Sequence, residues 1–169
     1  GVEGVRMASS QFWMDVIAEG KIRFPEEFKG AKYSNDAWKL GVALTHEWKP
    51  EPLRVDLILR DDSNTPEVKL LEVPGADFKC KRHLMEYAQE NARFLLRPAV
   101  KSIQGTFKFS SPAGPKMNSI TIVGPKFPSA HQIRKDEAIA WLLDGFEVFH
   151  VYMTQKLLVE FGRFNPRGK

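Results

Sequence analysis

The chain has 169 residues, 43% of them hydrophobic and 27% charged, which is typical of a soluble globular domain and argues against extended disorder. The formal net charge of +4 permits nucleic-acid binding without requiring it. A single cysteine, Cys80, excludes an internal disulfide and a multi-cysteine zinc site, so we expect a reducing intracellular compartment, cytoplasmic or nuclear. No apolar stretch reaches transmembrane length, so no membrane association is expected.

Residues 1–6 resemble a vector-derived leader ahead of a native start at Met7, and residues 7–169 are expected to form a single domain. Hydrophobic spacing and turn residues predict an alternation of helices and strands along it. In chain order these are a helix over 11–19, a helix over 36–48 or instead a strand over 40–44, strands over 53–60 and 67–73, a long helix over 78–97, strands over 106–109 and 119–123, a helix over 129–143, a buried strand over 146–153 and a helix over 154–162.

Gly20, Pro98 and Gly145 are expected to end helices. The turn-rich segment 61–66 joins two strands as an antiparallel hairpin, whereas the alternation of helix and strand in the second half implies parallel crossovers. The predicted fold class is therefore α/β, with a mixed central β-sheet flanked by helices.

Two carboxylates interrupt otherwise apolar strand-like runs: Asp56 in Val-Asp-Leu-Ile-Leu and Glu72 in Leu-Leu-Glu-Val. A charge in such a run is costly to bury unless it is paired, hydrogen-bonded or bound to a metal. A modest choice of register would put both side chains on one sheet face, where two close carboxylates would suit Mg²⁺ or Mn²⁺. The alternative is that each lies at a strand end or sheet edge in water.

The order of a helix, a hairpin with one carboxylate on each strand, a crossover helix and a further strand resembles the PD-(D/E)xK nuclease superfamily. In that resemblance Asp56 is the matching aspartate and Glu72 the glutamate of a Glu-x-Lys triplet. The triplet here is Glu72-Val73-Pro74, with proline in the lysine position. Glu67-Val68-Lys69 also spells the triplet, but it directly follows the turn, where charged residues are expected in solvent.

The cap-snatching endonucleases of segmented negative-strand RNA viruses, a branch of this superfamily, take the lysine from the following helix. By that resemblance Lys79 or Lys81 would be catalytic and His46 would be a metal ligand. The implied protein is a viral, metal-dependent nuclease, in which the ion polarises the phosphoryl oxygen and activates water. Its predicted metal shell is His46 (or Glu47), Asp56, Glu72 and the Val73 carbonyl, and its predicted nucleic-acid contacts are Lys79, Lys81 and Arg82.

Other interpretations remain open. The basic first turn of the long helix is also what a solvated helix face looks like, and His150 is expected to be a hydrogen-bonded core histidine. Pro74 favours a non-catalytic nucleic-acid-binding or assembly protein, and a protein-interaction module is a third reading. Nucleic acid is the expected partner, and the sequence does not decide between DNA and RNA. It also leaves open whether the protein forms a homo-oligomer or a larger assembly.

Overall fold

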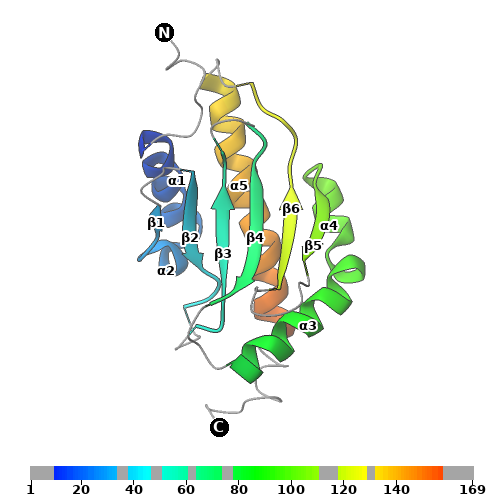
Figure 1. The fold of residues 1–169 in the computed structure, drawn as a ribbon. Coiled ribbons are helices and arrows are strands. Elements are labelled where there is room, and N and C mark those ends of the chain that lie inside the picture. The colour runs from blue at the N-terminus through cyan, green and yellow to red at the C-terminus, as the bar shows by residue number, and fades with distance from the viewer. Residues whose placement is uncertain are drawn as a thin grey trace.

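A computed structural model describes residues 10–33, 38–46, 51–60, 64–73, 78–110, 118–128 and 132–157. Six strands form one sheet in the order β1-β2-β3-β4-β6-β5 (Figure 1). The strands are β1 Lys32–Tyr33, β2 Lys39–Ala43, β3 Leu53–Ile58, β4 Glu67–Glu72, β5 Thr106–Ser110 and β6 Ser119–Val123. The helices are α1 Ser10–Arg23, α2 Pro25–Phe28, α3 Phe78–Leu95, α4 Arg97–Ser102 and α5 Gln132–Tyr152, followed by the π-helical turn η2 Met153–Leu157.

The predicted α/β class is confirmed, as are the central sheet with its helices and the hairpin of β3 and β4. The prediction of a mixed sheet is wrong, because all five strand pairings among the described residues are antiparallel. Its parallel crossovers depended on a strand over 146–153, but residues 146–152 continue α5 and Met153 begins η2. Residues 39–43 form a strand, so the helix expected over 36–48 is wrong and the strand alternative is confirmed.

Two glycines expected to end helices instead lie inside them. A Cβ at Gly20 would stand 2.3 Å from Cδ2 of Phe28, and one at Gly145 would stand 2.7 Å from Cγ2 of Val68. Because a side chain there would overlap a buried neighbour, these glycines let α1 approach α2 and α5 approach the sheet. Pro98 stands in the first turn of α4, where its missing N–H costs no helical hydrogen bond.

All the described helices contribute to one side of the sheet. In Figure 1, α5 lies behind the strands, and no helix crosses in front of them. The buried face carries the alternate residues of each strand, including Val55, Leu57, Val68 and Leu70, which are fully buried in the main hydrophobic cluster. The period-two alternation of these strands therefore produces a two-layer structure with one sheet face left without a helix.

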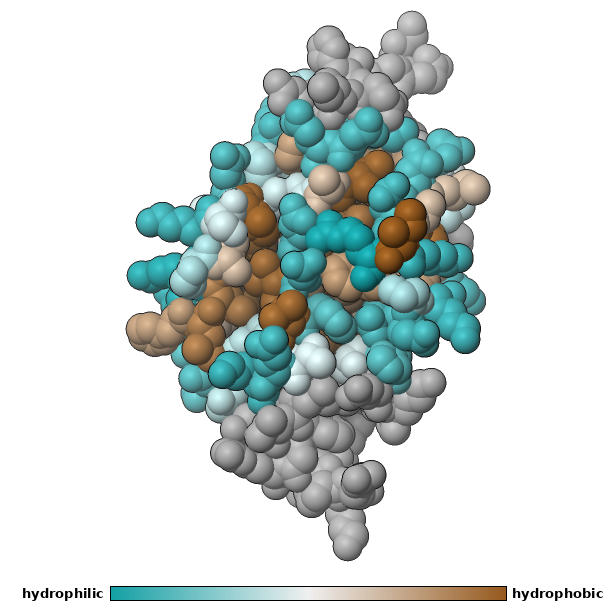
Figure 2. Space-filling model, turned by 180° about the vertical axis from the view of Figure 1, so that it is seen from behind, coloured by the Kyte–Doolittle hydropathy of each residue, from teal (hydrophilic) through white to brown (hydrophobic). Residues whose placement is uncertain are grey.

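The helix layer is seen from outside in Figure 2, where apolar side chains are interspersed among hydrophilic ones. Leu95 of α3 and Val151 of α5 are exposed and line an apolar groove of about 300 Å³ beside α4. Within the described residues, no helix combines the length and apolarity that a membrane span requires.

Candidate functional site

The sheet face without a helix carries a basic surface, which we call the open face. Its side chains form three rows across the strands, fixed by the pairing register. The rows are Lys39–Ile58–Glu67–Val123–Thr106, then Lys32–Gly41–Asp56–Lys69–Thr121–Lys108, and then Ala43–Arg54–Leu71–Ser119–Ser110. Ile58 and Leu71 lie outside the main hydrophobic cluster although they are buried, as expected for residues on the face opposite the helices.

Asp56 lies in the middle row and is held by cations of the same face. Its Oδ1 accepts a hydrogen bond from Nε of Arg54 at 3.1 Å, and its Oδ2 lies 4.0 Å from Nζ of Lys39. Gly41 is paired with Asp56 across the strands, and a Cβ there would make an ordinary van der Waals contact of 3.5 Å with Oδ1. The side chain is only 5% exposed, so this carboxylate is buried and paired, as the sequence argument required, but with protein cations.

Glu72 lies on the helix side of the sheet. It pairs with Leu53, whereas Asp56 pairs with Lys69, three residues away from Glu72 on β4. Because side chains alternate along a strand, the two carboxylates point to opposite faces. Glu72 is 1% exposed, and its Oε2 lies 3.4 Å from Nη2 of Arg82 on α3. The register predicted to bring both carboxylates together is therefore wrong.

The remaining predicted site residues are dispersed. The His46 side chain contacts Glu27, and Val73 donates its N–H to the Pro52 carbonyl. Arg82 faces Glu72, so it is committed to an ion pair within the fold. Lys79 and Lys81 belong to the first turn of α3, and their side chains, like Pro74 and Glu47, lie outside the described residues. Among the described residues, no group of three or more His, Cys, Asp or Glu side chains is placed to hold a metal ion.

A pocket opens where the open face meets the β1–β2 edge of the sheet, and we call it the edge pocket. It has a volume of about 680 Å³ and combines carboxylates, cations and an imidazole. Its chemically functional lining residues are Glu27, Lys29, Lys32, His46, Glu51 and Arg54.

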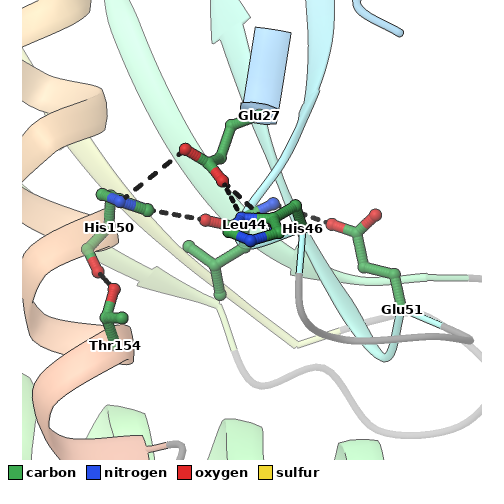
Figure 3. A network of polar contacts seen from close by, with 6 residues as sticks. All are labelled: Glu27, Leu44, His46, Glu51, His150 and Thr154. Carbon is green, nitrogen blue, oxygen red and sulfur yellow. Dashed lines mark hydrogen bonds and ion pairs between the residues drawn. The ribbon is translucent and has the colours of Figure 1, made fainter. Parts of the chain in front are cut away.

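Glu27 is the buried centre of the polar network beside this pocket (Figure 3). Its Oε2 accepts hydrogen bonds from Nδ1 of His46 at 2.8 Å and from the His46 backbone N–H at 3.2 Å. Its Oε1 lies 3.9 Å from Nε2 of His150, whose Nδ1 bonds the Leu44 carbonyl at 2.8 Å. A carboxylate with 7% of its side chain exposed thus fixes two imidazoles from distant parts of the chain.

Glu51 and His150 lie on opposite sides of Leu44, which directly follows β2 (Figure 3). Its Oε1 accepts a hydrogen bond from the Leu44 N–H at 2.8 Å. Burial raises the pKa of the Glu51 carboxyl to about 7, against the lowering effects of that hydrogen bond and of the Arg54 charge. A carboxyl group with such a pKa exists in both protonation states near neutral pH, which suits proton transfer.

Sequence reasoning missed Glu27 and Glu51 because both stand in segments without a periodic pattern. The one available signal is that each carboxylate is flanked by proline or aromatic residues, in Pro-Glu-Glu-Phe and in Pro-Glu-Pro. The expectation that His150 is hydrogen-bonded is confirmed, although it stands on a helix.

No protein-family model matches this sequence, and no curated protein matches it significantly. The apolar groove beside α4 includes Glu147 and Lys156 but no cluster of titratable groups like that of the edge pocket. The edge pocket combines carboxylates, cations and an imidazole, and it borders the basic open face.

Proposed function

We propose that the open face binds single-stranded nucleic acid through its phosphates. The observation that carries this proposal is the set of basic side chains that one sheet face carries, one on each of five of its six strands. They are Lys32, Lys39, Arg54, Lys69 and Lys108.

The acidic residues of the open face leave its net charge positive. Asp56 neutralises one of its two partners, Arg54 and Lys39, and Glu67 is paired with Arg60 at 3.2 Å. Lysine and arginine side chains on a sheet can follow a phosphate backbone without reading its sequence.

The width of the surface favours a single strand over a duplex groove. Six strands about 4.8 Å apart span about 24 Å, which is wider than the roughly 12 Å of a major groove. An extended strand can instead lie across the face, with some of its phosphates near the lysines of the middle row. Trp38, with Lys39 Nζ and Arg60 Cζ each 5.0 Å from its ring, adds an aromatic surface at the edge of β2.

A metal-dependent nuclease remains a prediction that the sequence alone supports. Its proposed carboxylate pair would need Asp56 and Glu72 on one face, and the strand register is against that arrangement. Binding through the open face needs no such pair, so we favour it as the function.

The test is the affinity of a labelled single-stranded oligonucleotide of about 12 nucleotides, measured by fluorescence anisotropy over a range of salt concentrations. Replacing Lys32, Lys69 and Lys108 together with alanine should weaken binding by about tenfold or more. It should also reduce the slope of log K against log salt by about 2, since each phosphate contact to a single strand contributes about 0.7.

The matched control replaces Lys21, Lys101 and Lys156, which lie on helices, with alanine. This variant loses the same amount of positive charge as the open-face variant. It should bind nearly as the parent does. Equal losses in the two triple variants would refute the open face as the binding surface, because net charge alone would then explain the effect. Duplex binding as tight as single-strand binding would refute the preference for a single strand.

A further inference from the structure

The edge pocket shares part of its wall with the open face. Lys32, Gly41 and Arg54 belong to both surfaces. A strand bound along the middle row of the open face would therefore reach the pocket at its β1 end. There its phosphate would meet Lys32 and Arg54 with His46 and Glu51 in the same pocket.

We propose that the edge pocket cleaves RNA phosphodiesters by metal-independent acid–base catalysis, with His46 as the base, Glu51 as the acid and Arg54 and Lys32 facing the phosphate. The proposal rests on the proposed function, because the open face has to deliver the strand.

His46 is oriented for the role of base by Glu27. Glu27 Oε2 accepts the His46 backbone N–H, and with the same oxygen as acceptor in the 2.8 Å contact the imidazole proton is placed on Nδ1. The neutral ring then carries its lone pair on Nε2, which is the tautomer that a base needs. The His46 side chain is 50% exposed and lines the pocket, whereas Glu27 beneath it is buried.

Glu51 is suited to the role of the acid. With a pKa of about 7, a substantial fraction of its carboxyl groups hold a proton at neutral pH. Oε1 is engaged by the Leu44 N–H, so Oε2 is the oxygen that would carry the proton. Two titratable groups of opposite roles in one pocket are the minimum for concerted proton transfer.

Arg54 provides the positive charge for the phosphorane-like transition state. Its Nε donates a hydrogen bond to Asp56, which holds the guanidinium in place beside the pocket. Lys32 adds a second cation from the neighbouring strand β1. Cations fixed before the reaction stabilise developing charge without reorganising.

The reaction balances with the pocket's own groups. His46 Nε2 takes the proton of the ribose 2′-hydroxyl, and the 2′-oxygen forms a bond to phosphorus. The bond from phosphorus to the 5′-oxygen breaks, and the Glu51 carboxyl donates its proton to that oxygen. The products are a 2′,3′-cyclic phosphate and a free 5′-hydroxyl, and proton exchange with solvent restores His46 and Glu51.

The cleavage rate should fall above pH 7, because Glu51 then loses the proton that it donates to the leaving oxygen. The charged or titratable groups that surround the pair are Glu26 and Glu27 of α2, Lys29 after it, Lys32 of β1, Arg54 of β3 and His150 of α5.

The experiment uses the full chain in EDTA with two oligonucleotides of one sequence, RNA and its 2′-O-methyl form. The 2′-O-methyl strand has no nucleophile and reports binding alone. His46→Gln and Glu51→Gln should each slow RNA cleavage by about a hundredfold or more, the range for a general acid or base, while affinity for the 2′-O-methyl strand changes less than about twofold. The matched control Glu86→Gln, on the exposed side of α3, should cleave as the parent does.

Each outcome decides the proposal. RNA that binds but is not cleaved refutes the catalytic pocket and leaves the open face as a binding surface. Cleavage that survives both substitutions, or that requires added Mg²⁺ or Mn²⁺, also overturns it. Failure of the 2′-O-methyl strand to bind refutes the proposed function together with the inference drawn from it. A contaminating ribonuclease is recognised because it would cleave equally in all preparations.

Discussion

Replacing Gly145 with alanine tests the packing of α5 against the sheet. A Cβ at this position would lie 2.7 Å from Cγ2 and 3.3 Å from Cβ of Val68, which is fully buried on β4. Alanine should gain about 1 kcal/mol of helix propensity over glycine. Overpacking against a buried β-branched side chain costs about 1–3 kcal/mol, because valine has no easy alternative rotamer. We therefore expect Gly145→Ala to reduce the free energy of unfolding by about 1 kcal/mol.

The same substitution should change sign when Val68 is shortened. Val68→Ala removes the overlapping methyl groups, so in that background Gly145→Ala should stabilise by up to about 1 kcal/mol. The resulting coupling energy of about 2 kcal/mol is within the range for residues in contact. Urea unfolding of the four proteins of this cycle measures it. If Gly145→Ala stabilises the parent as much as it stabilises Val68→Ala, α5 does not approach β4 as described.

Two further predictions concern the buried carboxyl groups. Between pH 4.5 and about 7 the folded state retains a proton on Glu51 that the unfolded state has released, so the free energy of unfolding should fall as pH rises. Urea titrations at several pH values should show this slope reduced in Glu51→Gln, and an unchanged slope would contradict the burial of that group. Glu72→Gln should destabilise the protein by about 1–3 kcal/mol by leaving Arg82 without its ion pair. In a double-mutant cycle with Arg82→Met the two losses should be less than additive, and strict additivity would refute that ion pair.

The strands at 53–58 and 67–72 could be predicted because their largely alternating apolar residues both favour a strand locally and form the buried face of the sheet. Alternating apolar residues bounded by turn formers are read directly as a hairpin. Residues 146–153 mislead because their aromatic and β-branched side chains favour a strand locally. In the fold Phe146, Phe149 and Tyr152 are buried in the core at helical spacing, and α5 packs against β3 and β4. Gly145 was expected to end a helix because the sequence shows only that a side chain is absent there. It does not show the buried neighbour, Val68, that leaves no room for a side chain.

The candidate site could be predicted only in part. That Asp56 and Glu72 must be compensated follows from the sequence, but their faces depend on the pairing register, and a slip of one residue would reverse either of them. His46 was identified as a functional candidate, but its partner Glu27 is 19 residues away in a segment without periodicity. Such contacts arise from the packing of α2 beside β2, which no local pattern encodes.

The compensation of Asp56 has a consequence for the open face. A carboxylate can be buried at acceptable cost when a metal ion or a guanidinium compensates its charge. The sequence places a guanidinium, that of Arg54, two residues before Asp56. Residues two apart on a strand share a face, so Arg54 and Asp56 are neighbours whatever the register of the hairpin. Asp56 thereby fixes a cation where the open face meets the edge pocket. The buried charge that first indicated a metal site instead orients the arginine that both proposals require.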